Sequence, residues 1–104
     1  MRQFAFTMKL KPGNVAEYKR RHEKIWPELA RLLREAGIAD YAIFLDEKTL
    51  TLFAVQEQAD GNTIAELPLH PIVKRWWDYM APLMEVNPDN SPVCGELQRV
   101  FHLE

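Results

Sequence analysis

The chain has 104 residues, of which 47% are hydrophobic and 27% charged, and its formal net charge is -2 at pH 7. A chain of this length buries roughly two-thirds of its unfolded surface in one core, so we expect a single domain over residues 1–104. The slight negative charge argues against nucleic-acid binding, and no apolar run approaches the roughly 20 residues that cross a membrane.

Cys94 is the only cysteine, so an intrachain disulfide is excluded and the composition is typical of a reducing compartment. The first residues, MRQFAFTMK, lack the long apolar run of a secretory signal because Lys9 interrupts it. We therefore expect a cytoplasmic protein.

Residues 2–10 alternate between apolar and polar positions, which is the pattern of a β-strand. In residues 15–36 the apolar positions instead recur with the periodicity of a helix. Asn14 and Glu17 resemble a capping box at the start of this helix, and Gly37 supplies its stop. We expect one helix over residues 15–36 with a kink at Pro27, which lacks a backbone donor.

His22 lies in the middle of the apolar stripe of this helix, where a leucine is the usual residue. The rest of the stripe is apolar or aromatic: Val15, Tyr18, Ile25, Trp26, Leu29, Leu33 and Ala36. The opposite face is charged in both signs, with pairs such as Glu17 and Arg21 four residues apart, and is typical of a solvated surface.

The second half of the chain contains two more β-rich runs, DYAIFLD and TLTLFAVQE, joined by the polar turn DEKT. A helical segment broken near Pro68 follows, and a helix with one apolar face starts at Pro71. After the turn-forming loop NPDNSP, the closing ELQRVFHL is expected to be a last strand.

The order strand-helix-strand-strand-helix-strand predicts an α+β, ferredoxin-like βαββαβ fold with a four-stranded antiparallel sheet. Two helices cover one face of such a sheet, yet the strands carry apolar residues on both faces, as in Phe44 beside Ile43. We expect the bare face to pair with a second copy, giving a homodimer with a dimeric α/β barrel.

Metal and phosphate sites are not indicated. His22, His70, His102 and Cys94 have none of the spacings typical of metal ligands, and no glycine pattern forms a phosphate loop.

The candidate site residues are His22, Tyr18 one turn before it, Tyr41 at the start of a strand, and the pair Trp76 and Trp77. Three of them also have an ordinary structural explanation. A core histidine bonded to a backbone carbonyl explains His22 as well as a functional role does. Trp76 lies on the apolar stripe and is explained as a core residue, and Tyr41 is explained by packing within the sheet. Trp77 lies 100° from Trp76 around the helix, so one of the two should reach the edge of the interior.

Together these residues describe a cleft with aromatic faces, two phenols and an imidazole. Aromatic faces suit the C–H face of a sugar, and an imidazole moves protons near neutral pH. A pair of carboxylates suited to glycoside hydrolysis is not evident, so proton transfer is favoured.

The segments YKRRHEKIWPEL, DYAIFLD, RWWDYM, NPDNSPV and ELQRVFHL resemble, in order and spacing, the L-rhamnose mutarotase family over nearly the whole chain. The resemblance is weakest over QEQADGNTIAELPLH. It implies a ferredoxin-like dimeric α/β barrel and an activity that interconverts the α and β anomers of L-rhamnose in rhamnose catabolism. It also implies that His22 donates a proton and that Tyr18, Tyr41, Trp76 and Trp77 bind the sugar.

The implied reaction opens the pyranose to the aldehyde, rotates the C1–C2 bond and recloses the ring, without a metal or an organic cofactor. The group that removes the anomeric proton stays open among Tyr18, Tyr41, a water molecule and a loop residue such as Asp89. Two other classes of protein also stay open: a cofactor-free monooxygenase on the same dimeric barrel, and a non-catalytic sugar-binding module.

Overall fold

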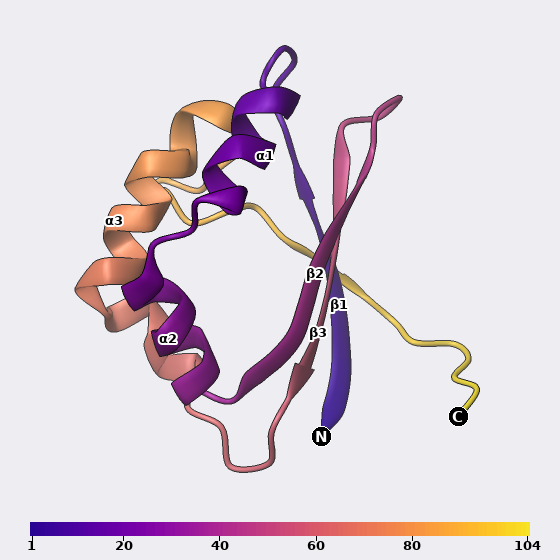
Figure 1. Cartoon of the computed structure of the whole chain (residues 1–104). Helices are drawn as coiled ribbons and strands as arrows, with labels where there is room; N and C mark the ends of the chain where they lie inside the picture. The colour runs from indigo at the N-terminus through magenta and orange to yellow at the C-terminus, as the bar shows by residue number, and fades with distance from the viewer.

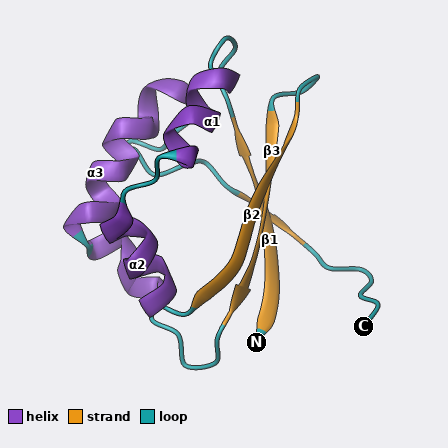
Figure 2. Ribbon diagram, in the orientation of Figure 1, coloured by secondary structure: helices purple, strands orange, loops and turns teal.

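One antiparallel sheet with helices on a single face makes up the computed structural model, which describes residues 1–104 (Figures 1 and 2). Its strands are β1 (Arg2–Lys9), β2 (Ile38–Asp46), β3 (Thr51–Gln58) and β4 (Gly95–Leu97), in the order β2-β3-β1-β4. The helical elements are α1 (Val15–Glu23), α2 (Pro27–Glu35), α3 (Pro71–Met80) and the 3₁₀ turns η1 (Ile64–Leu69) and η2 (Ala81–Leu83). The predicted α+β class with a ferredoxin-like βαββαβ order is confirmed.

The helix predicted over residues 15–36 is in fact two helices, so the expectation of one kinked helix was wrong. The helix α1 ends at Glu23, and Trp26 has the extended backbone angles φ -61° and ψ 127° immediately before α2. Pro27 disfavours the helical conformation of the residue before it, and it is itself well suited to the first position of a new helix. The proline therefore separates two helices.

The predicted capping box at Asn14 does not form either. Asn14 Nδ2 donates to the carbonyl oxygens of Lys11 and Pro12, and its side chain makes no cap bond to α1. Glu17 binds Arg20 and Arg21 instead. The predicted stop at Gly37 is correct, since this glycine has a φ of 104° after α2.

The core lies between the sheet and the helices in two clusters. The larger contains eight buried residues: Met8, Leu10, Tyr18, Leu52, Ala54, Met80, Leu83 and Met84. The smaller contains Leu29, Ile72 and Val73 between α2 and α3. Trp76 packs against both clusters, so α3 joins the two parts of the core.

The last strand is shorter than expected. Residues 95–97 pair with Thr7, Phe6 and Ala5 of β1, and the chain then leaves the sheet on the side away from the helices (Figure 1). The side chains of Val100, Phe101 and Leu103 are 89%, 75% and 80% exposed. Only the first part of ELQRVFHL forms a strand, because no further backbone of this chain lies beside the rest.

The sheet face without helices is apolar near its centre. Phe44 of β2 and Phe53 of β3 are directly paired and are 61% and 37% exposed. Leu97 pairs with Ala5 and is 43% exposed. Among the helices, none is long and apolar enough to cross a membrane.

Candidate functional site

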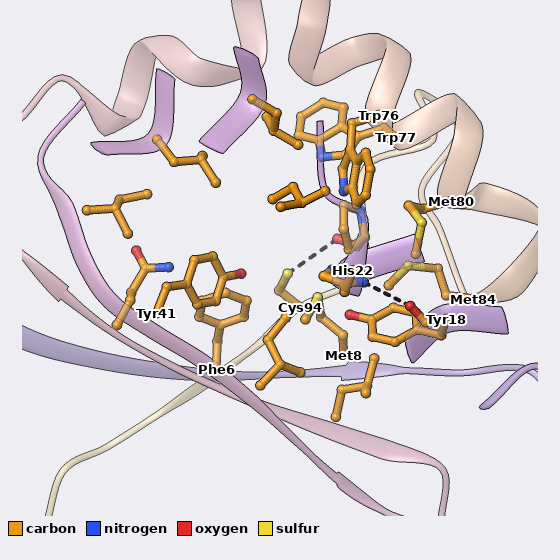
Figure 3. A pocket seen from close by; sticks show the side chains of 18 of the residues that line it. Phe6, Met8, Tyr18, His22, Tyr41, Trp76, Trp77, Met80, Met84 and Cys94 are labelled. Atoms are coloured by element: carbon orange, nitrogen blue, oxygen red, sulfur yellow. Dashed lines mark hydrogen bonds between the residues drawn. The ribbon is translucent and has the colours of Figure 1, made fainter. Parts of the chain in front are cut away.

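All five residues singled out in the sequence line one cavity between the sheet and the helices, with a volume of about 1230 Å³. His22 and Tyr18 come from α1, Trp76 and Trp77 from α3, and Tyr41 from β2. In Figure 3 the hydroxyls of Tyr18 and Tyr41 point toward one another across the cavity, and the two tryptophans lie on its helical side. The fold thus brings together residues separated by up to 59 positions in the sequence.

His22 is held by a backbone carbonyl and open on its other side. Its Nδ1 lies 3.1 Å from the carbonyl oxygen of Tyr18, one turn earlier in α1 (Figure 3). A neutral imidazole donates its Nδ1–H to such an oxygen, which leaves Nε2 with a free lone pair. Nε2 makes no hydrogen bond within the chain. Every fully buried polar side-chain atom does have a hydrogen-bond partner, so Nε2 is not fully buried and is accessible. The core-histidine interpretation accounts for the Nδ1 bond but not for Nε2.

The environment of His22 disfavours its charged form. Burial lowers the pKa of His22 below its usual value of 6.5, and the hydrogen bond to the Tyr18 carbonyl opposes this shift only in part. The neutral imidazole is therefore the main form at neutral pH. A minority of imidazolium is a stronger acid than an unperturbed histidine.

A β-bulge turns Tyr41 into the cavity. The β2–β3 pairing passes from Ala39 opposite Glu57 to Ala42 opposite Val55, so two residues of β2 face one residue of β3. Asp40, inside the bulge, has a φ of 49°, a conformation tolerated by aspartate. Bulges of this kind redirect side chains at functional sites.

Both phenols remain protonated at neutral pH. Burial raises the pKa of Tyr41 to about 12, with a smaller contribution from Cys94. Burial also raises the pKa of Tyr18 far above its usual value, and Tyr41 adds to that shift. The two hydroxyls are therefore hydrogen-bonding groups and not bases.

Aromatic contacts position the imidazole against α3. The centre of the His22 ring lies 4.3 Å from the centre of the Tyr18 ring and 5.4 Å from that of Trp76, which it meets edge to face. Trp76 in turn contacts Trp26 edge to face at 5.0 Å and Tyr79 at 5.7 Å. Trp76 and Trp77 are both half-buried and both line the cavity. The sequence predicted that at least one of the two would reach the edge of the interior, and in the structure both do.

The cavity has no group of three metal-ligating side chains, because no cluster of three His, Cys, Asp or Glu residues exists in the chain. Cys94 lines the cavity, and its Sγ donates to the carbonyl oxygen of Pro92 at 3.5 Å. Burial raises the pKa of this thiol, so it stays protonated at neutral pH.

Asp89, one of the four candidate proton acceptors, does not line the cavity. Its Oδ1 accepts a hydrogen bond of 2.9 Å from the backbone N–H of Ser91. Asn90 reaches the cavity in its place, with its Nδ2 donating to Asp78 Oδ1 at 2.9 Å.

Sequence reasoning missed Gln56, which also lines the cavity and is 4% exposed. Its signal was present: Leu52, Ala54 and Gln56 alternate along β3, so an amide occupies an inward position. The arrangement as a whole offers an accessible imidazole nitrogen, two neutral hydroxyls and aromatic faces. It suits proton transfer to an uncharged polar molecule with an apolar side.

Comparison with known proteins gives one consistent family. Residues 3–103 match the family model for L-rhamnose mutarotase. A protein named L-rhamnose mutarotase from Brucella anthropi is 54% identical over 101 residues, which cover 97% of this chain and 95% of that protein. Another of that name from Flavobacterium johnsoniae is 54% identical over 100 residues, covering 96% and 94%. The crystal structure of L-rhamnose mutarotase from Formosa agariphila superposes with a TM-score of 0.93 at 48% identity and covers all of both chains.

Proposed function

This chain belongs to the L-rhamnose mutarotase family and is an isomerase that acts on a sugar, and from this premise we propose that it interconverts the α and β anomers of L-rhamnose with His22 as the proton donor. The observation that carries the assignment of His22 is its accessible Nε2 in a cavity with two phenols and two tryptophans. Tyr18, Tyr41, Trp76 and Trp77 bind the sugar.

The reaction breaks the bond between C1 and the ring oxygen and later forms it again. A proton moves from Nε2 of the His22 imidazolium to the ring oxygen, while the anomeric hydroxyl loses its proton and C1 becomes an aldehyde. Rotation about C1–C2 presents the other face of the aldehyde, and the reverse transfers close the ring. Positioned acid–base catalysis of this kind contributes typically 10²–10⁴-fold.

The Tyr18 carbonyl orients the catalytic ring. Because Nδ1–H is bonded to this oxygen at 3.1 Å, Nε2 is the nitrogen that exchanges protons with the substrate. The same bond stabilises the imidazolium once Nε2 takes a proton back.

Water is the acceptor of the anomeric proton in this proposal. Tyr18 and Tyr41 remain protonated because burial raises the pKa of each, and Asp89 lies outside the cavity lining. Among Tyr18, Tyr41, Asp89 and water, these observations favour water as the acceptor.

The aromatic side chains suit the apolar parts of the sugar. Trp76 and Trp77 present ring surface to the cavity, which matches the C–H face and the 6-methyl group of rhamnose. The hydroxyls of Tyr18 and Tyr41 match the sugar hydroxyls. The chemistry described here uses neither a metal nor an organic cofactor.

We further propose that residues 1–104 are one domain that forms a homodimer through the helix-free face of the sheet, giving a dimeric α/β barrel. Support comes from the exposed pair Phe44 and Phe53 and from Leu97 on the same face. The tail that leaves the sheet on this side carries the exposed apolar residues Val100 and Phe101 (Figure 1). An isologous contact covers all of these groups in both copies. Cys94, the only cysteine, is not in a disulfide, which supports a cytoplasmic location.

Exchange NMR tests the activity. The anomeric protons of α- and β-L-rhamnose give separate signals, and the rate of exchange between them is measured with and without the protein. Acceleration proportional to protein concentration supports the proposal, and a binding module without activity leaves the rate unchanged while still binding the sugar.

A further inference from the structure

A buried amide lies on the sheet side of the cavity. Gln56 is the only polar or charged residue among the 14 buried residues of the chain. It follows Leu52 and Ala54 on the inward face of β3, and both of those are core residues. A leucine or valine there would extend the core, so the amide calls for an explanation in terms of a hydrogen bond.

Only one end of this amide is paired within the chain. Nε2 of Gln58 donates to Oε1 of Gln56 at 2.9 Å, which fixes the orientation of the Gln56 carboxamide. Nε2 of Gln56 has no partner in the chain. No fully buried polar side-chain atom is unpaired, so this Nε2 must reach the open space of the cavity that Gln56 lines.

The bulge in β2 places Gln56 beside Tyr41. Asp40 and Tyr41 are the two residues of β2 that oppose Gln56 alone, between the pairs of Ala39 with Glu57 and Ala42 with Val55. Tyr41 and Gln56 therefore occupy the same end of the cavity. Tyr18, from the helix that carries His22, lies at the other end (Figure 3).

We infer that Gln56 is a further substrate-binding residue, whose Nε2–H donates to a hydroxyl on C3 or C4 of the sugar while Gln58 holds the amide in place. This inference rests on the proposed function. With the ring oxygen and C1 at His22, the opposite atoms of a pyranose ring are C3 and C4, and their hydroxyls face the end formed by Tyr41 and Gln56. Together, the Tyr41 hydroxyl and the Gln56 amide make a hydroxyl-reading subsite.

The placement in the cavity carries this assignment. Gln56 lines the cavity from β3, on the inward face that also carries Leu52 and Ala54. An amide that is bound at Oε1 and free at Nε2 is a prepared donor, because the orientation is fixed before the ligand arrives.

The test combines Gln56→Met with sugars that lack one hydroxyl. Exchange NMR gives kcat/KM for L-rhamnose and for its 2-, 3- and 4-deoxy analogues with each protein. Gln56→Met is expected to lower kcat/KM for L-rhamnose roughly 3- to 10-fold, the usual effect of losing one hydrogen bond between uncharged groups. For either the 3-deoxy or the 4-deoxy sugar, wild type and variant should be equal, because the partner hydroxyl is already missing.

Gln58→Met is the matched control on the same strand. Gln58→Met keeps the Nε2–H donor of Gln56 but removes the hydrogen bond that orients the Gln56 amide. It should therefore lower kcat/KM for L-rhamnose by less than Gln56→Met does. An equal loss on all four sugars with Gln56→Met indicates a structural role and overturns the inference, as does no loss on any of them.

A measurement on the wild-type chain covers the case in which Gln56→Met does not fold. The side-chain amide signals of Gln56, assigned by through-bond NMR, should shift on saturation with L-rhamnose, while those of exposed Gln3 and Gln98 stay in place. An unchanged Gln56 amide overturns the subsite. If the wild type binds rhamnose and shifts this amide without accelerating exchange, the proposed activity fails while the subsite stands.

Discussion

Arg21 of α1 is bound to Tyr79 of α3 in two ways. Its guanidinium carbon lies 4.1 Å from the centre of the Tyr79 ring, and its Nη1 donates to the carbonyl oxygen of the same residue. Nε of Arg21 also donates to Glu17 at 2.6 Å. Because the Tyr79 ring contacts Trp76, this link fixes α1, which carries His22, against the helix that carries both tryptophans.

Arg21→Gln is therefore expected to lower the free energy of unfolding by about 1–2 kcal/mol, through loss of the cation–π contact and of the bond to the Tyr79 carbonyl. Urea unfolding followed by circular dichroism measures the change. Arg31→Gln is the matched control, because Arg31 is 69% exposed and lies 3.9 Å from Glu35, and such pairs contribute little. Equal effects of the two substitutions would contradict a special role for Arg21.

Acid should weaken the same part of the molecule through Glu17. Hydrogen bonds from Arg20 and Arg21 lower the pKa of Glu17 from 4.5 to about 2. A carboxylate whose pKa is lowered in the folded state stabilises that state above its unfolded pKa, and the contribution disappears as the pH falls. The Tm of wild type should therefore fall more steeply between pH 4.5 and pH 2 than that of Glu17→Gln. Parallel Tm curves would show that the two arginines do not act on this carboxylate.

The sheet was predictable from the sequence because strand alternation is a local signal. The pattern of residues 2–10 specifies which side chains of β1 face the core, and Met8 and Leu10 are indeed buried. The end of β4 was not predictable in the same way. Residues after Leu97 have strand-like composition, but a strand exists only where another backbone lies beside it.

The break at Pro27 shows the limit of a periodicity argument. The apolar stripe continues in register through Ile25 and Trp26, so the pattern predicts one helix. The backbone departs from it because Trp26 is extended before the proline. The stripe still identified the correct inward face, which explains why His22 was found despite the wrong helix length.

The site was predictable only in part. The helical stripes placed His22, Tyr18 and Trp76 on inward faces, and the cavity contains all three. Gln56 could not be linked to Tyr41 from the sequence, since the bulge that makes them neighbours depends on the pairing of two strands. The lowered pKa of His22 likewise depends on burial by distant elements.

The proposed dimer predicts a sedimentation mass of twice 12.2 kDa at micromolar concentration. Phe44→Lys places a charge at a side chain that is 61% exposed on the helix-free face, so it should produce monomers because a buried unpaired charge is costly. Leu69→Lys on η1 is the control, since Leu69 is 74% exposed on the helix side. A monomeric wild type, or a Phe44→Lys protein that remains dimeric, would contradict the proposed interface.

The tryptophans should contact the sugar. Saturating L-rhamnose is expected to change tryptophan fluorescence, and Trp77→Ala should weaken binding because it removes aromatic surface from the cavity. Replacing the 6-methyl group by hydroxymethyl, as in L-mannose, should cost about 1–3 kcal/mol, the usual value of one small group in an apolar pocket. Isothermal titration measures the affinity of Trp77→Ala for L-rhamnose and the affinity of wild type for L-mannose. Unaltered fluorescence together with unaltered affinity of Trp77→Ala would remove the contact from the model of binding.

The pH dependence of exchange tests the protonation state of His22. If the imidazolium donates the proton, the acceleration should increase as the pH falls from 8 and level off below the pKa of His22, which burial places under 6.5. The free energy of unfolding should instead decrease as the pH falls. Since the folded-state pKa is lowered, the unfolded chain binds the proton more readily and the free energy of unfolding falls below pH 6.5. An acceleration that rises with pH would instead assign the neutral imidazole the role of base.

Two substitutions separate the two ring nitrogens of His22. Asparagine places an amide N–H near the position of Nδ1, so His22→Asn can keep the bond to the Tyr18 carbonyl while it removes Nε2. It should fold and dimerise as wild type does and lose most of the acceleration, on the order of 10²-fold or more. His22→Gln places its amide nearer the position of Nε2, but this amide does not titrate, so it should be equally inactive and lose the Tyr18 bond as well. If His22 were only a core residue bonded at Nδ1, His22→Asn would exchange the anomers at the wild-type rate per folded molecule. That result in the NMR assay would move the acid from His22 to another group lining the cavity.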